Sequence, residues 1–347
     1  MTYDVYEKNF RLKASLAGYS EEEILKCLKY AKPLLDKSLP VIYNTSNLAA
    51  LVGYNKNYMK RAVHHPDFFY RIFNIKKKNG KLREIKEPLP SLKEIQVWIL
   101  RNILYNVPVS KFAKAYVPKR NMLDNVRYHR GKDLVLSLDI ENFFPSIKES
   151  SIQRIFEFMG YSSNISNLLS KLCCYENILP QGAPTSAYLS NIYLIEFDNL
   201  VADLCTKIEV RYTRYADDLF FSGEFDEDKI IELVAEELNK LNLKLNKEKI
   251  KVMRQSDRQI ITGIVVNKTI QLSNENRKEI RQEIFYIKKF GLESHLAKTK
   301  NNRANYIFHL LRKINYAIYI NPKDKKMLEY KSYINDAYMK GPESANN

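Results

Sequence analysis

The stretch RYTRYADDLFFSG, residues 211–223, contains two adjacent aspartates, Asp217 and Asp218, within an apolar and aromatic run. Such a run is typical of a buried strand, and ionised carboxylates are costly to bury without partners. The pair therefore predicts the turn of a β-hairpin that aims both side chains at one edge of a sheet. Taken alone, an Asp-Asp pair is also an ordinary solvated turn.

A third carboxylate makes the functional interpretation stronger than the solvated turn. Asp139 follows directly on the apolar strand LVLSLD, and IENFFPSI continues the chain after it. If the two strands are neighbours, three carboxylates converge at one edge of the sheet. Magnesium prefers oxygen ligands of this kind, and two such ions can activate an attacking hydroxyl and stabilise a leaving oxygen.

The charge of the chain points to a polyanionic partner. The 347 residues include 56 lysines and arginines against 40 acidic residues, which gives a net charge of +16. The isoelectric point near 9.4 is typical of nucleic-acid-binding proteins. The chain also carries 24 tyrosines and 16 phenylalanines, whose rings can stack on bases. A membrane surface would attract the same charge, but no strongly cationic amphipathic helix is present.

Several other classes of protein do not fit. No apolar run approaches the ~18 residues that span a bilayer, and the N-terminus lacks the apolar core of a secretory signal, so we expect a cytoplasmic protein. The four cysteines form no CxxC pair and the five histidines no HExxH motif, which argues against a zinc site.

The order of the expected elements predicts an α+β fold, with helices packed against a mostly antiparallel sheet. Strands are expected around Asp139 and in residues 211–223. A further hairpin is expected over 68–88 with Asn79 and Gly80 at its turn, and a β run over 259–267. Helices are expected over 1–65 (with Pro33 interrupting or kinking one of them), 91–104, 150–161, 164–176, 187–205 (as one long helix), 227–245 and from about 274 onward.

Four motifs in this order resemble those of reverse transcriptases. YADD at 215–218 resembles their catalytic signature, and LDIENFFPSI at 138–147 resembles their first aspartate motif. LPQGAPTSAYLSN at 179–191 is similar to their template- and nucleotide-contacting loop and helix. LNLKLNKEKIKV at 241–252 is similar to the lysine-bearing motif that follows. The resemblance covers residues ~60–320.

Within that family the chain looks most like the bacterial retron enzymes. NVRYH at 125–129 and ITG at 261–263 resemble their NAxxH and VTG motifs, with Val126 replacing Ala and Ile261 replacing Val. The resemblance implies a right-hand polymerase with fingers, an antiparallel palm and a helical thumb. The implied divisions are an N-terminal helical region (1–65), fingers (66–132), palm (133–270, with fingers helices around 148–178) and a basic thumb with its tail (271–347).

The resemblance also implies roles for individual residues. Asp139 and Asp217 would ligate two Mg²⁺ ions, with Asp218 as the third carboxylate, the Ile140 carbonyl as a further ligand and Lys249 protonating the leaving pyrophosphate. For the incoming dNTP, Arg83 would pack on the base, Lys77 would reach the γ-phosphate, Phe144 would screen the sugar 2′ position, and Gln181 and Gly182 would approach the nucleotide. RNA contacts would come from Asn125, His129, Arg277, Lys278 and Arg281.

Plainer interpretations remain open for several of these residues. A run of lysines is usually a solvated face, and Phe143 or Phe144 can serve core packing, for which Phe143 is the better candidate. Asn125 and His129, spaced i and i+4, share a helix face and suit a structural hydrogen-bonded histidine as well as an RNA contact.

The leading hypothesis is a retron RNA-directed DNA polymerase. It would copy part of its own structured noncoding RNA into branched, RNA-linked single-stranded DNA (msDNA). The product would stay bound and govern a separate effector protein in antiphage defence. The alternatives are a group II intron-like or abortive-infection polymerase, and a non-catalytic scaffold that binds RNA and restrains a toxin.

Overall fold

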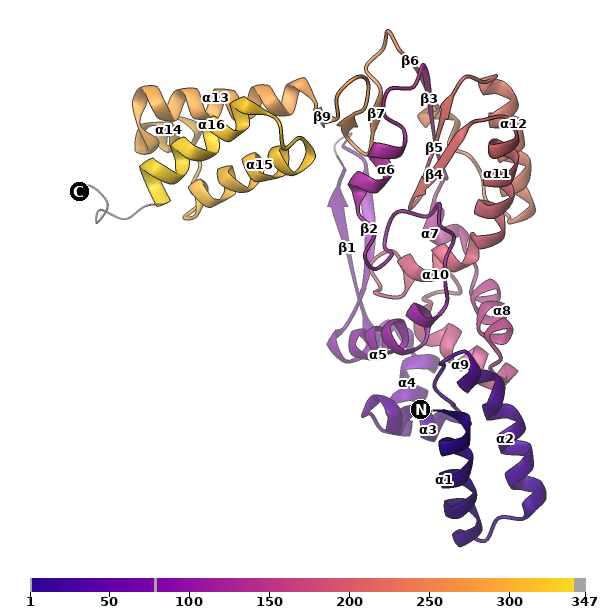
Figure 1. Cartoon of the computed structure of the whole chain (residues 1–347). Helices are drawn as coiled ribbons and strands as arrows, with labels where there is room; N and C mark the ends of the chain where they lie inside the picture. The colour runs from indigo at the N-terminus through magenta and orange to yellow at the C-terminus, as the bar shows by residue number, and fades with distance from the viewer. Residues whose placement is uncertain (1, 78–79, 340–347) are drawn as a thin grey trace.

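The computed structural model describes residues 2–77 and 80–339 of the chain. Figure 1 shows a helical N-terminal part, a mixed body around one sheet, and a helical bundle that carries the C-terminus away from the body. Two residues expected near the tip of the first hairpin, Lys78 and Asn79, lie outside the described residues.

The N-terminal part is helical, as predicted. Its helices are α1 (Tyr3–Leu16), α2 (Glu21–Asp36), α3 (Thr45–Val52) and α4 (Lys56–His64). A capping box between Ser20 and Glu23 starts α2. Of the two expectations for Pro33, interruption of the helix was wrong, because α2 continues past Pro33 to Asp36. Pro33 lies in the last turn, so its missing amide removes a backbone hydrogen bond only near the end of the helix.

The predicted hairpin over 68–88 is confirmed. Strands β1 (Tyr70–Lys76) and β2 (Leu82–Pro88) pair antiparallel and are mostly exposed. The Gly80 amide, at a positive φ of 82°, donates to the Lys77 carbonyl at 3.0 Å. Helix α5 (Pro90–Asn102) follows the hairpin and joins it to the core of the body.

The centre of the body is an antiparallel sheet of order β4-β5-β3-β6. Its strands are β3 (Leu134–Asp139), β4 (Arg211–Tyr215), β5 (Asp218–Gly223) and β6 (Lys251–Arg254). Alternation along β3 sends Leu136 and Leu138 into one core cluster and Val135 into the other. The central strands β3 and β5 are therefore buried on both faces, which explains why they read as nearly continuous apolar runs.

Helices cover both faces of this sheet (Figure 1). Helices α11 (Ile195–Lys207) and α12 (Glu227–Lys240) lie on one face, and α6 (Met122–Tyr128) packs against β4 from the other. The remaining helices of the body are α7 (Phe143–Ser146), α8 (Glu149–Met159), α9 (Ser163–Cys173) and α10 (Ser186–Tyr193). The single long helix expected over 187–205 is two helices with a break at Leu194, because α10 packs on α8 while α11 packs on β4.

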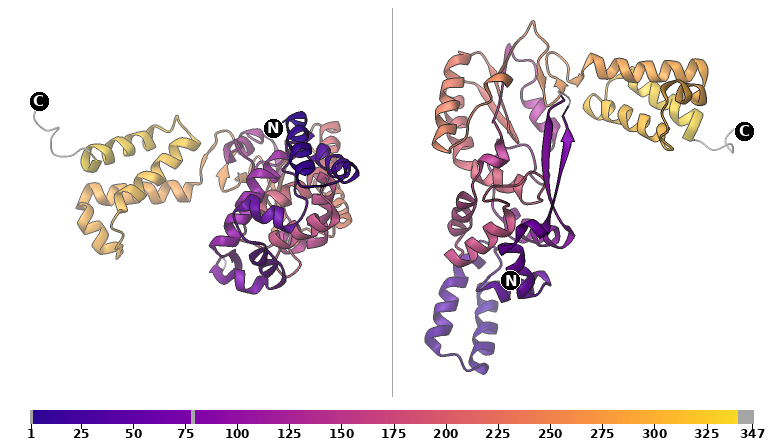
Figure 2. Two further views of the ribbon diagram at one scale, coloured as in Figure 1. Left: turned by 90° about the horizontal axis from the view of Figure 1, so that it is seen from below. Right: turned by 180° about the vertical axis from the view of Figure 1, so that it is seen from behind.

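The C-terminal part begins with a small sheet and continues as a bundle. Strands β7 (Ile260–Ile261), β8 (Ile264–Val265) and β9 (Gln271–Leu272) form the small sheet. The bundle contains α13 (Asn274–Phe290), α14 (Leu292–Thr299), α15 (Tyr306–Ile320) and α16 (Lys325–Ile334). It projects to one side of the body in all views (Figure 2), and its apolar residues continue the core cluster that contains Val135. Single short turns complete the described chain: η1 (Pro66–Phe69), η2 (Leu104–Asn106), η3 (Lys247–Lys249) and η4 (Asn335–Met339).

Candidate active site

Pairing between β3 and β5 brings the three aspartates to one edge of the sheet. Asp139 ends β3 and lies directly opposite Asp218, the first residue of β5. The next backbone amide, that of Ile140, donates to the Asp217 carbonyl at 3.0 Å. The sequence prediction that these strands are neighbours is therefore correct, and 78 residues of intervening chain close into one site.

Asp217 occupies a tight turn. Tyr215 and Asp218 pair as the last rung of the β4–β5 hairpin, so Ala216 and Asp217 form a two-residue loop. Ala216 has a φ of +60°, in the left-handed region that turns of this kind demand at their first position and that glycine usually fills. An L-residue pays about 1–2 kcal/mol for this conformation, so neighbouring contacts must hold it.

The site carries more negative charge than its surroundings balance. Burial, followed by repulsion from Asp217 and Asp139, raises the pKa of Asp218 to about 7. Burial and the Asp139 charge likewise raise the pKa of Asp217. Lys249, from η3, places its Nζ 2.7 Å from Asp139 Oδ2 and partly offsets this repulsion. Additional positive charge at this edge would offset the repulsion that remains between the carboxylates.

The donor set suits a divalent cation in type and in backbone placement. It consists of carboxylate oxygens, which magnesium prefers, at the ends of paired strands. Across the residues that the structure describes, however, no three acidic, histidine or cysteine side chains are gathered closely enough to hold an ion as they stand. In addition, an Asp139 oxygen is engaged by Lys249, so a cation would have to compete with that ammonium.

The residues expected to meet the nucleotide come from separate segments. Lys77 and Arg83 are exposed on the β1–β2 hairpin, and the charge of Arg83 reaches Asp217, where it offsets part of the rise in the pKa of that carboxyl. Phe144 is half-buried, whereas Phe143 is only 4% exposed, as expected for the core member of that pair.

The loop that carries Gln181 and Gly182 docks on this hairpin. The Lys86 amide of β2 donates to the Gln181 carbonyl at 2.9 Å. A Cβ on Gly182, whose φ is +132°, would lie 2.9 Å from the Lys86 carbonyl oxygen. Only glycine allows the loop and β2 to approach this closely.

Asn125 and His129 are buried, which corrects the expectation that they touch RNA. Both are 0% exposed. His129 Nδ1 lies 2.7 Å from Ser222 Oγ, and its Nε2 lies 2.6 Å from Thr213 Oγ1, whose hydroxyl donates to Asn125 Oδ1. These hydrogen bonds connect α6 to β4 and β5. Asn125 and His129 therefore have the structural role that was the alternative to an RNA contact.

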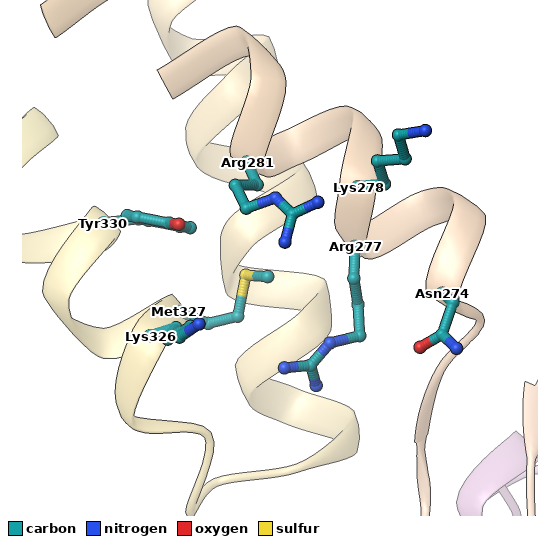
Figure 3. Close-up of a pocket in the computed structure, with 7 residues that line it drawn as sticks. All are labelled: Asn274, Arg277, Lys278, Arg281, Lys326, Met327 and Tyr330. Carbon is teal, nitrogen blue, oxygen red and sulfur yellow. The ribbon is translucent and has the colours of Figure 1, made fainter. Parts of the chain in front are cut away.

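The C-terminal bundle presents the predicted basic residues unequally (Figure 3). Lys278 and Arg281 are exposed. They line a hollow of about 210 Å³ between α13 and α16, together with Asn274, Arg277, Lys326, Met327 and Tyr330. Arg277 instead directs its guanidinium to Asp324, the N-cap of α16, and to Gln271. Arg277 therefore holds the bundle together in addition to contributing charge.

Two further residues at the site escaped sequence analysis. Tyr116 is 54% exposed with a φ of +60°, and the charges of Asp217 and Arg83 both act on its hydroxyl. Arg214 is completely buried behind the aspartate turn and donates to the Ala216 carbonyl at 3.0 Å. No sequence pattern marks Tyr116. The arginine two residues before Ala216 was visible, but its burial was not.

This arrangement defines a class of protein. An antiparallel sheet with three carboxylates at one edge, a basic hairpin facing them and a basic helical bundle beside them form a nucleic-acid polymerase of the right-hand type. Residues 75–302, about two thirds of the chain, match the family described as "Reverse transcriptase (RNA-dependent DNA polymerase)". The chain belongs to the reverse transcriptase family and is an RNA-directed DNA polymerase.

The relatives of this chain are retron enzymes, a narrower group within the reverse transcriptases, in agreement with the resemblance seen in the sequence. The chain is 28% identical to the Retron Ec86 reverse transcriptase of Escherichia coli, over 89% of this chain and 95% of that one. It is 30% identical to the Retron Mx65 reverse transcriptase of Myxococcus xanthus, over 70% of this chain and 62% of that one. The enzyme is therefore of the retron type, and the α+β right-hand fold predicted from the sequence is confirmed.

Among solved structures, the foamy viral protease-reverse transcriptase in complex with double-stranded DNA aligns with 78% of this chain and 43% of its own. Its sequence identity is 16% and its TM-score 0.41. In the part of the chain that the structure describes, no helix is both long enough and apolar enough to span a bilayer.

Proposed function

We propose that this polymerase copies part of its own structured noncoding RNA into single-stranded DNA that remains linked to the RNA as a branch. The observation that carries the chemistry is the pairing of Asp139 with Asp218, with Asp217 in the adjoining turn. Two Mg²⁺ ions held by Asp139, Asp217, Asp218 and the Ile140 carbonyl would activate the attacking hydroxyl and stabilise the leaving oxygen.

The chain's own residues would orient the substrates. Lys77 and Arg83 neutralise the triphosphate of the dNTP, and the planar guanidinium of Arg83 also packs against the base. Phe144 would clash with a ribose 2′-hydroxyl and so would favour deoxyribonucleotides. Gln181 and Gly182 bring backbone close to the sugar. Lys249, already hydrogen-bonded to Asp139, gives its proton to the departing pyrophosphate.

The RNA would lie along the basic surface of the bundle. Lys278 and Arg281 are exposed there and can neutralise backbone phosphates. Arg277 contributes charge while it is paired with Asp324. Shape and 2′-hydroxyls are the features by which a protein reads folded RNA, which suits a charged helical face.

The proposal extends to biology through the retron relatives. The RNA–DNA product would stay bound to the enzyme in the cytoplasm and govern a separate effector protein in defence against phage. We expect cells that carry the gene with its flanking DNA to contain branched DNA. If extracts contain only linear cDNA, another class of bacterial reverse transcriptase becomes the better description.

The catalytic assignment is tested by replacing Asp217 and Asp218 together with Asn. This change keeps size and hydrogen bonding but removes two charges. Synthesis of cDNA on the copurified RNA should be lost, while RNA remains bound. A matched control is Asp226→Asn, an exposed carboxylate at the start of α12. Retained synthesis in the double variant would show that the carboxylates have another role.

A further inference from the structure

The aspartate turn is supported from behind by a buried, charged cluster. Arg214 on β4 and Asp198 on α11 are both 0% exposed. Arg214 Nε and Nη2 donate to the two oxygens of Asp198 at 2.8 and 2.7 Å, a two-pronged ion pair. Burying two charges is costly unless their geometry is well satisfied, so this pair contributes something that apolar packing would not.

The ion pair fixes the orientation of the guanidinium, and the guanidinium in turn binds the aspartate turn. The remaining prong of the guanidinium, Nη1, donates to the Ala216 carbonyl at 3.0 Å and to Asn191 Oδ1 at 2.9 Å. Ala216 is the left-handed residue that precedes Asp217. The Asp217 carbonyl, in turn, accepts from the Ile140 amide. Both peptide carbonyls of the turn are thereby fixed, one by Arg214 and one by β3.

The same cluster orders a second segment that faces the site. The Arg214 amide donates to the Phe112 carbonyl, and the Arg214 carbonyl accepts from the Lys114 amide. Asn191 Nδ2 donates to the Ala115 carbonyl at 2.9 Å. The chain then reaches the exposed Tyr116, so Arg214 connects the aspartate turn with the loop that presents this ring, through its own backbone and through Asn191.

We propose that Arg214 is a positioning residue of this polymerase: it holds the strained Ala216–Asp217 peptide so that the aspartate side chains face the edge of β3, where they bind the divalent cation. Arg214 touches neither substrate nor cation and acts through Ala216. Asp198 orients the guanidinium, and Tyr212 orients Asp198 through a 2.8 Å hydrogen bond. The inference rests on the proposed function because it assumes that the aspartates hold a cation.

The test measures cation binding directly, with Mn²⁺ as the probe. Free Mn²⁺ is followed by electron paramagnetic resonance during titration of the full-length protein, and the variant with Asn at 217 and 218 supplies the blank. Arg214→Lys keeps the positive charge but lacks the planar guanidinium that donates to Asp198 and Ala216 at the same time. We expect its dissociation constant for Mn²⁺ to rise by about tenfold, as is usual when a group that orients metal ligands is removed.

Two further variants separate positioning from general stability. Phe156→Leu removes volume from a completely buried core site on α8 and should lower the unfolding temperature while leaving Mn²⁺ affinity unchanged. Ala216→Gly, added to Arg214→Lys, supplies a residue that adopts positive φ freely and should restore part of the lost affinity. An Arg214→Lys protein that binds Mn²⁺ as tightly as the natural protein would overturn the inference, and so would the absence of any rescue by glycine.

If Arg214→Lys does not fold, Tyr212→Phe carries the test. It keeps the packed ring and removes only the hydrogen bond to Asp198, so we expect a two- to threefold weaker Mn²⁺ affinity, roughly the loss of half a kcal/mol of orientation. Unchanged affinity would again contradict the role. The proposed function fails separately: natural protein that binds Mn²⁺ but makes no RNA-linked DNA would refute that function and leave the comparison of variants intact.

Discussion

His129 makes the stability of this enzyme depend on pH, and its surroundings determine the direction. The ring is completely buried between the hydroxyls of Ser222 and Thr213. Because Thr213 gives its own hydrogen to Asn125, it accepts from His129 Nε2, and Nδ1 accepts from Ser222. This network satisfies a neutral imidazole. A second ring proton, on Nδ1, would meet the Ser222 hydroxyl hydrogen, and that hydroxyl would have to rotate before its oxygen could accept.

Burial, and then the positive charges of Arg211 and Lys114, lower the pKa of His129 from 6.5 to about 3. The unfolded chain therefore binds a proton below pH 6.5 that the folded protein excludes until about pH 3. Stability rises with pH wherever the unfolded state binds more protons. The contribution is complete above pH 6.5 and is lost as the pH falls from there toward 3.

The size of this loss in the free energy of unfolding follows from about 1.36 kcal/mol for each pH unit below the pKa of the unfolded histidine. Between pH 6.5 and 5 the loss is about 2 kcal/mol, and it changes little for any folded pKa well below 5. His129→Gln offers a neutral donor and acceptor at the same place but cannot titrate. We expect the natural protein to lose about 2 kcal/mol more than this variant between pH 7 and 5.

Urea denaturation followed by circular dichroism, on nucleic-acid-free protein without divalent cations, measures both free energies of unfolding. Comparing the two proteins removes the contributions of all other titrating groups, including the aspartates of the active site. Equal losses in both proteins would mean that His129 binds a proton as readily in the folded protein as in the unfolded chain, and the network described here would be wrong.

Three further predictions concern residues to which the proposed function assigns nucleotide or RNA contacts. Gly182→Ala should destabilise the protein by roughly 1–3 kcal/mol and impair cDNA synthesis, because its Cβ meets the Lys86 carbonyl. Gly53→Ala, also at a positive φ but with open space around it, should cost less and leave synthesis intact. Phe144→Ala should raise ribonucleotide incorporation roughly tenfold or more in primer-extension assays, whereas Phe143→Leu, in the core, should not change selectivity. Arg277→Ala should lower the free energy of unfolding by about 1–3 kcal/mol because Asp324 loses its partner. Lys278→Ala should leave stability unchanged and should reduce the slope of log K for RNA binding against log salt concentration by about one.

The sequence alone determined the enzyme class, because four motifs in order resemble those of reverse transcriptases. An apolar strand that ends in Asp139 and a hairpin turn at Asp217 are local signals, and they predicted that the carboxylates lie at one edge of a sheet. Periodicity likewise predicted most helices and the β1–β2 hairpin, since those depend on neighbouring residues. The break at Leu194 could not be predicted, because separate packing partners of α10 and α11 cause it.

Only the tertiary structure decided which polar residues are exposed and which are buried. Asn125 and His129 carry donors and acceptors that suit RNA or a core network equally, and the choice depends on Thr213 and Ser222, about 90 residues away along the chain. Arg214 and Lys278 look alike in a sequence, yet one is fully buried against Asp198 and the other is exposed. The physical reason is that burial and pairing of a charge depend on long-range contacts, whereas the sequence specifies only that a charge is present.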